Sequence, residues 1–267
     1  MTRGGLLRRG AKDGATERRD LEATLAALPQ AEAFVQRLVA RFRPFMTLEP
    51  GATVMDLGAA QGLTSAAYTR AGFKTCGVEP WVPAIEVSHQ LGERLGVTFD
   101  IREGMGEALP FEDQSIDLIH AYSVMEHVDD PHQVFREAYR VLRPGGGFYF
   151  MTANILSPRQ NEIAGFPLFP WYPPRLQRKI MLWAAENRPS LVGYTPRPAM
   201  HWYRQRATRV ALTAIGFRQV VDKWRMRAAS GELTGIRQIV VRSATSNPVI
   251  RLAGDVALGT TEFLAVK

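Results

Sequence analysis

Short apolar runs alternate with longer segments whose apolar residues recur at helical spacing, and this alternation predicts an α/β fold. The apolar runs predict strands at 54–57, 75–79, 97–102, 117–122, 146–152, 217–226 and 260–266. The segments between the first five runs predict helices at 63–71, 83–95 and 131–142. Such a chain forms a Rossmann-like, mostly parallel sheet of seven strands with helices on both faces. Ligands then bind at the carboxyl ends of the strands.

The chain before the first strand divides into two parts. Residues 1–20 are polar, basic and contain glycine, which predicts a flexible arm. The core begins at residue 21 with apolar positions at helical spacing up to residue 43, among them Leu38 and Phe42. Pro29 interrupts this helix or starts a new one.

Residues 154–203 interrupt the alternation, so the first part of the core is expected to span 21–153. Aromatic residues lie among prolines in the first half of this segment, namely Phe166, Phe169, Trp171 and Tyr172. So many prolines disfavour regular structure, and a basic helix is predicted after them at 175–186. We interpret residues 154–203 as a lid inserted after the fifth strand.

The remaining residues, 204–267, are expected to complete the core. A helix at about 204–216 precedes the sixth strand. A helical segment follows that strand, with a break at Asn247-Pro248, and leads to the last strand.

Composition is ordinary for a globular protein, with 46% hydrophobic and 22% charged residues. The single cysteine, Cys76, excludes an internal disulfide. The net charge of +7 is unevenly distributed: residues 21–154 carry ten basic and seventeen acidic side chains, whereas residues 155–210 carry nine basic and two acidic ones. No run has the length of a signal peptide or a membrane span, so we expect a cytoplasmic protein.

The turn after the first strand carries the main chemical signal. Asp56-Leu57-Gly58 ends a buried strand, and Gly62 precedes a helix whose first N–H groups are unpaired. Glu79 ends the second strand, where a carboxylate grips ribose hydroxyls in nucleoside sites. A dinucleotide site needs a glycine where Ala60 stands, so a ligand with adenosine but no phosphate fits better.

These residues resemble motif I of class I S-adenosylmethionine-dependent methyltransferases. The likeness continues through Gly104–Phe111, Ser115–Val128 and Val141–Gly147, in the pattern of the ubiquinone/menaquinone-biosynthesis-type (methyltransferase type 11) branch. It covers roughly residues 50–153, and four motifs in the right order make it specific.

The resemblance implies S-adenosyl-L-methionine as cofactor and a set of residues that bind it. These residues are Asp56, Gly58, Ala59, Gly62, Glu79, Pro80, Met105, Gly106, Glu107 and Ser123. The sequence departs from the family at Met105, which replaces the usual acidic residue beside the adenine. We expect Met105 to pack on the ring, with Gly106 and Glu107 making the polar contacts.

Two histidines are candidates for a catalytic base. His127 follows the fourth strand, near the transferring methyl group, and His201 lies at the end of the lid beside Trp202 and Tyr203. A purely structural role is an open alternative for both. No cluster with metal-ligand spacing is apparent, so no metal site is expected.

The predicted function is methyl transfer to a small-molecule or lipid-linked acceptor, at oxygen. An RNA or protein methyltransferase, or a cofactor-binding protein without turnover, remains an alternative. Aromatic and basic residues in 166–183 suit either an apolar acceptor or a peripheral contact with an anionic membrane. A well-packed, proline-rich cover with a solvated basic face is an equally open alternative. Nucleic acid is the weaker partner because the chain has no appended RNA-binding module.

Overall fold

The computed structural model describes residues 14–158, 160–192 and 197–267, with side chains from residue 21 onward. Within these residues, seven strands form one sheet in the order β3-β2-β1-β4-β5-β7-β6. The strands are β1 Thr53–Leu57, β2 Lys74–Glu79, β3 Asp100–Glu103, β4 Ile116–Tyr122, β5 Leu142–Ala153, β6 Gln219–Asp222 and β7 Thr260–Val266. β7 pairs antiparallel with both neighbours, and the other pairs are parallel. The predicted Rossmann-like fold is confirmed.

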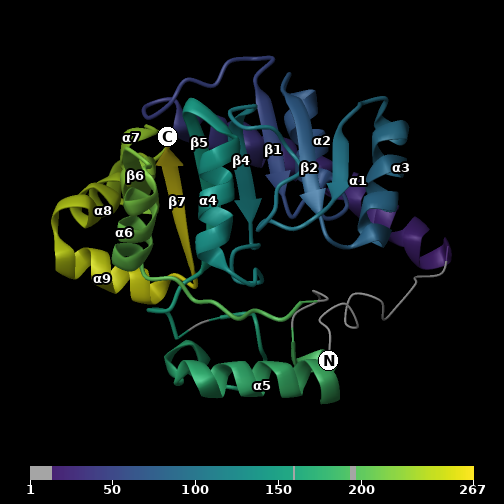
Figure 1. Cartoon of the computed structure of the whole chain (residues 1–267). Coiled ribbons are helices and arrows are strands. Elements are labelled where there is room, and N and C mark those ends of the chain that lie inside the picture. Colours follow the sequence, from purple (N-terminus) through teal and green to yellow (C-terminus); the bar gives the residue numbers. More distant parts are fainter. Residues whose placement is uncertain (1–13, 159, 193–196) are drawn as a thin grey trace.

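Helices cover both faces of this sheet (Figure 1). The helices of the described residues are α1 Gly14–Phe42, α2 Leu63–Arg70, α3 Val82–Leu95, α4 Pro131–Val141, α5 Pro174–Asn187, α6 Gln205–Ile215, α7 Lys223–Ala229, α8 Gly235–Ser246 and α9 Pro248–Ala257. α4 and α6 pack on one face, against strand residues such as Met55 and Phe148. α1, α2 and α7 pack on the other, against Val54 and Tyr149. Successive side chains of a strand point to opposite faces of the sheet, so they pack into two separate hydrophobic cores.

The first helix differs from the prediction. α1 begins at Gly14, inside the segment predicted to be an arm, while residues 1–13 lie outside the described residues. The helix also continues through Pro29 without a break. Proline removes one helical hydrogen bond, but the buried residues Leu28 and Val35 on either side of it hold the helix on the core.

Several strand boundaries also differ from the predicted ones. The third strand occupies 100–103 instead of 97–102, and β5 begins at Leu142, directly after α4. The sixth strand was predicted to reach residue 226 but ends at Asp222. The Asp222 carboxylate accepts hydrogen bonds from the N–H groups of Trp224 and Arg225, both at 3.1 Å, and so starts α7.

The segment predicted to be a lid lies between β5 and α6, and α5 stands apart from the sheet at its lower end in Figure 1. It has a hydrophobic cluster of its own, in which buried Phe169 and Met181 pack with Phe166, Tyr172 and Trp202. Most of the aromatic residues expected to cover an acceptor therefore pack on one another. Trp171 is the exception, being 54% exposed.

No helix in the described part of the chain is long and apolar enough to cross a membrane.

Candidate functional site

The turn between β1 and α2 is held by hydrogen bonds to β2. The N–H groups of Gly58 and Ala59 donate to the Val78 carbonyl at 2.8 and 3.1 Å. The Ala60 N–H donates to Glu79 Oε2 at 2.9 Å. These bonds place the turn at the carboxyl end of the sheet, where parallel α/β folds bind ligands.

Three residues of this turn have left-handed backbone conformations: Gly58, Ala60 and Gly62, with φ of 73°, 46° and 79°. A Cβ at Gly58 would lie 2.4 Å from Val124, and one at Gly62 would lie 2.8 Å from the Ser88 Cβ. Both glycines are thus required by close packing as well as by φ. Ala60 adopts the same conformation with a Cβ, which is unfavourable by roughly 1–2 kcal/mol.

Glu79 is buried at the tip of β2. Its Oε2 accepts from Ala60, as above, and its Oε1 accepts from the Trp81 N–H at 3.0 Å. Burial raises the pKa of Glu79, and these two backbone donors oppose the rise. A carboxylate has about four lone-pair sites, so both oxygens keep capacity for a further donor.

Asp56 lies beneath the turn and does not face the cavity described below. Ser65 Oγ donates to its Oδ2 at 2.9 Å, and His120 Nδ1 lies 3.3 Å from its Oδ1. All three side chains are buried. The sequence analysis did not identify His120, because a histidine within a strand carries no motif that distinguishes it from a core residue.

A small cavity of about 60 Å³ opens at this edge of the sheet. Six residues expected at the site line it: Gly58, Pro80, Met105, Gly106, Glu107 and His127. Leu57, Val78, Gly104, Val124, Val128 and Arg197 complete the wall. Five residues expected at the site are not part of this lining: Asp56, Ala59, Gly62, Glu79 and the exposed Ser123.

The lining combines bare backbone, a thioether and polar atoms. Gly58 leaves its face bare of a Cβ, and Met105 offers a thioether. Within the part of the chain that the structure describes, two buried polar atoms of the lining have no hydrogen-bond partner, Glu107 Oε2 and His127 Nδ1. Such atoms are costly to bury unsatisfied, so a polar ligand that pairs with them would be stabilised.

The two candidate histidines lie in different surroundings. Burial lowers the pKa of His127 to about 4, so its ring is neutral near pH 7. His127 Nε2 lies 3.8 Å from the Glu162 carboxylate of the lid. Burial also lowers the pKa of His201, whose ring lies against the backbone of Val128 and Asp129. His201 does not line the cavity, and its backbone N–H donates to the backbone carbonyl of Glu126 at 3.2 Å.

Glu126, which the sequence analysis gave no chemical role, is a buried carboxylate beside His127. Thr152 Oγ1 donates to its Oε2 at 2.8 Å, and burial raises its pKa to about 7. In the described ranges, Glu126, His127 and Glu162 each place one ligand atom within 4.8 Å of the others, a grouping that can hold a metal ion. The sequence analysis expected none, because Glu162 lies far along the chain.

Arg197 joins the lid to the cavity. Its Nη1 lies 3.1 Å from Met105 Sδ, and its Nη2 lies 2.7 Å from Asp129 Oδ2. The lid is further fixed by Tyr203, whose hydroxyl donates to the Met125 carbonyl at 2.6 Å. Sequence patterns did not identify Arg197, because one arginine among several in a basic segment carries no positional signal.

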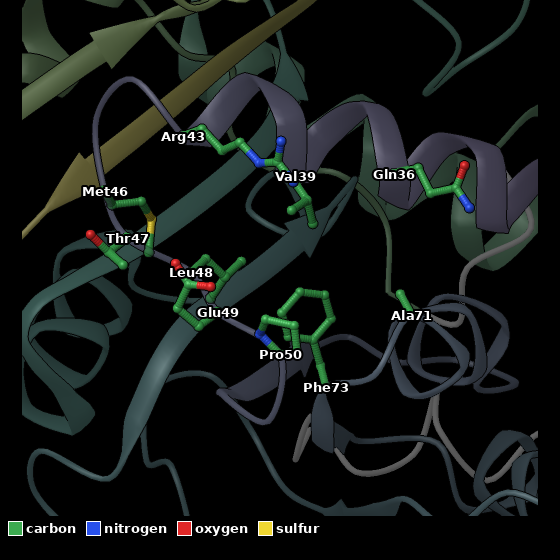
Figure 2. Close-up of a pocket in the computed structure, with 10 residues that line it drawn as sticks. All are labelled: Gln36, Val39, Arg43, Met46, Thr47, Leu48, Glu49, Pro50, Ala71 and Phe73. Carbon is green, nitrogen blue, oxygen red and sulfur yellow. The ribbon is translucent and has the colours of Figure 1, made fainter.

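A larger cavity of about 500 Å³ lies at the opposite, amino-terminal edge of the sheet. Figure 2 shows the α1 residues Gln36 and Val39, with Arg43 just after the helix, on one side of it, and Phe73 and the loop before β1 on the other. None of the residues expected at the site lines this cavity. It is therefore separate from the candidate site.

The strand order, with an antiparallel β7 between β5 and β6, and a cavity beside the first strand–helix turn define a class I methyltransferase fold. Solved structures agree at the level of the fold. The S-adenosylmethionine-dependent methyltransferase from Mesorhizobium loti superposes with a TM-score of 0.58 at 17% identity, covering 85% of this chain and 95% of that one. A geranyl diphosphate methyltransferase, solved with geranyl diphosphate and sinefungin, gives 0.53 at 22% identity over 89% of this chain and 76% of that one.

Sequence comparison identifies the domain. Residues 55–150 match the family described as methyltransferase domain. An uncharacterized methyltransferase of Mycobacterium sp. (strain KMS) is 39% identical over 102 residues, 38% of each chain. The ubiquinone biosynthesis O-methyltransferase of Pseudomonas entomophila (strain L48) is 34% identical over 107 residues, 39% of this chain and 45% of that protein. Residues 55–150 thus form an S-adenosylmethionine-dependent methyltransferase domain, and the chain spans less than half the length of these relatives.

Ala60→Gly should stabilise the protein. The substitution removes the strain of the left-handed conformation but increases the conformational entropy of the unfolded chain. The net gain in the free energy of unfolding should be about 0.5–1 kcal/mol. Urea unfolding measures it. Ala59→Gly is the control and should destabilise, because Ala59 is buried and has no positive φ. A less stable Ala60→Gly variant would contradict the assigned conformation.

Glu126→Gln should change how stability depends on pH. The folded-state pKa of Glu126 lies near 7, above its ordinary value, so its contribution is complete at pH 4 and is lost as pH rises through 7. The stability of the wild type relative to Glu126→Gln should therefore fall by roughly 2–3 kcal/mol between pH 4 and 8. Urea unfolding across this range tests it, with exposed Glu112→Gln as the control. A constant difference would show that Glu126 does not titrate as described.

Proposed function

We propose that this chain transfers a methyl group from S-adenosylmethionine to a hydroxyl oxygen of a small-molecule or lipid-linked acceptor. The observation that carries the proposal is the position of His127. Its ring lines the cavity beside Gly58, and its Nε2 lies 3.8 Å from the Glu162 carboxylate in the segment 154–203, a position that supports a role for it next to both the cofactor and the acceptor. The likeness to ubiquinone biosynthesis O-methyltransferases supports oxygen as the methylated atom.

Different residues at the site would bind different parts of the cofactor. The lone pairs left on Glu79 would accept from the ribose hydroxyls, and the unpaired Oε2 of Glu107 would accept from the adenine amino group. Met105 would pack on the base. When bound, the cofactor supplies a sulfonium methyl group that its positive charge has already activated.

The protein's remaining task is alignment and proton removal. His127 is neutral near pH 7, and its ring lies against the backbone of Arg197 and Pro198. Its Nδ1 makes no hydrogen bond of normal geometry among the described residues. It would accept the hydroxyl proton as the acceptor oxygen bonds to the methyl carbon and the carbon–sulfur bond breaks. The carboxylate of Glu162, 3.8 Å from Nε2, would stabilise the imidazolium that results. His201 would hold the loop after β4 and take no part in proton transfer.

The outer side of the lid supports a lipid-linked acceptor. Leu176, Leu182 and Trp183 on α5 are exposed, on the same helix as Arg175, Arg178 and Lys179. Apolar and basic side chains on one surface helix suit an anionic membrane surface. We infer that α5 contacts the membrane while the inner side of the lid covers the acceptor.

Glu79→Ala should weaken the binding of S-adenosylmethionine at least tenfold, about 1.4 kcal/mol, because the ribose hydroxyls lose their acceptor. Isothermal titration calorimetry measures it. Glu103→Ala is the matched control, since exposed Glu103 ends the neighbouring strand in register with Glu79. Equal affinities, or no binding by the wild type at millimolar ligand, would overturn the cofactor assignment.

His127→Asn should lower kcat about a hundredfold and leave cofactor affinity within twofold, because the proton acceptor is lost while the cavity wall remains. The assay follows the labelled methyl group into a panel of phenols, quinols and sugars, with bulk tRNA as a separate arm. Exposed His132→Asn is the control. Labelling of tRNA alone would contradict a small acceptor, and an active His127→Asn enzyme would contradict the assigned base.

A further inference from the structure

Helix α9 is oriented with its apolar side outward. Val249, Leu252 and Val256 share one stripe and are 73%, 53% and 36% exposed, whereas Asp255 on the inner side is 4% exposed. Surface helices of globular proteins normally show the reverse arrangement. The outward stripe therefore needs an explanation that the methyl-transfer site does not provide.

Polar contacts fix this orientation. The Asp255 carboxylate accepts from Trp224 Nε1 at 2.8 Å and from Gln205 Nε2 at 2.9 Å, and lies 3.2 Å from Lys223 Nζ. Arg251 donates to Gln205 and to Asp222. A Cβ at Gly254 would lie 2.5 Å from Trp224, so the helix backbone packs directly on that ring. Rotating α9 to bury its apolar stripe would break all of these contacts.

Helix α8 packs beside α9 and also exposes apolar residues. Its inner residues, Val241 and Ala244, pack with Trp224, while Ile236, Ile239 and Val240 are exposed. We call the exposed apolar residues of both helices, together with Leu258 directly after α9, the α8–α9 surface: Ile236, Ile239, Val240, Val249, Ile250, Leu252, Val256 and Leu258. Single exposed apolar residues are normal, but a group this dense marks a site of interaction.

The charges beside this surface are of one sign. Residues 235–258 contain three arginines and one acidic residue, and that residue is the buried Asp255. Arg251 is bound to Asp222, whereas Arg237 and Arg242 are exposed. A dimer of two such surfaces would bring arginines of both copies together, which opposes self-association. An anionic bilayer matches both the apolar stripe and the arginines.

We propose that the α8–α9 surface is a membrane-binding site, which inserts its apolar residues among the headgroups of an anionic bilayer. The two helices would lie along the surface, since neither is long enough to span it. In Figure 1, α9 lies toward the same end of the sheet as α5. The inference rests on the packing of α9 and does not require the proposed methyl transfer.

The test is co-sedimentation of the full chain with vesicles of phosphatidylcholine alone or with one quarter phosphatidylglycerol. The wild type should bind the anionic vesicles at least tenfold more tightly, and added salt should weaken binding. The double variant Ile236→Asp/Val249→Asp should lose at least tenfold in affinity. Val210→Asp is the matched control, because Val210 on α6 is also 63% exposed but lies outside the surface. Circular dichroism melts verify that each variant is folded.

Three outcomes would overturn the proposal: no binding of the wild type to anionic vesicles, unchanged binding of the double variant, or a wild-type dimer in light scattering that the double variant dissolves. The last would assign the surface to a second copy of the chain. Trp183→Asp tests the α5 contact separately, so the two membrane sites are distinguishable. Because vesicle binding is measured without cofactor or acceptor, failure of the proposed methyl transfer would not affect the result.

Discussion

One carboxylate determines the form of the candidate site. The two oxygens of Glu79 accept hydrogen bonds from Ala60 in the turn after β1 and from Trp81 at the start of α3. Because Glu79 is buried, water cannot readily replace these hydrogen bonds. The backbone at Ala60 and at Trp81 must therefore keep the conformation in which both N–H groups point at the carboxylate. Through these two bonds, the Glu79 carboxylate contacts both the left-handed turn at Ala60, which leads into α2, and the start of α3. A nucleoside that bound here would meet a preformed acceptor.

Sequence patterns predicted most of this arrangement because the parts are local. The glycines at 58 and 62, the carboxylate at 79 and the loop at 104–107 each belong to one strand end, and parallel strands place those ends together. The predicted helix break at Pro29 was wrong, since tertiary packing outweighed one lost hydrogen bond. The sixth strand was overextended because the capping role of Asp222 was not recognised within an apolar run.

The residues that sequence patterns missed contact partners that lie far from them in the sequence. Arg197 and Glu162 reach the site from the lid, and His120 reaches Asp56 from a neighbouring strand. None of these pairs has a spacing that a local motif could reveal. The sequence left open whether the aromatic residues of the lid cover an acceptor, contact a membrane or pack on one another, and Phe169 lies in a hydrophobic cluster within the lid itself. A segment rich in aromatic residues and proline carries the same signal whether it faces a ligand or its own core.

The position of Arg197 has a consequence for access to the cavity. The same guanidinium contacts Met105 in the cavity wall and Asp129 in the loop that receives the lid. A ligand seated against Met105 is therefore enclosed from the lid side as long as this bridge holds. Entry and departure at that seat then require the bridge to open.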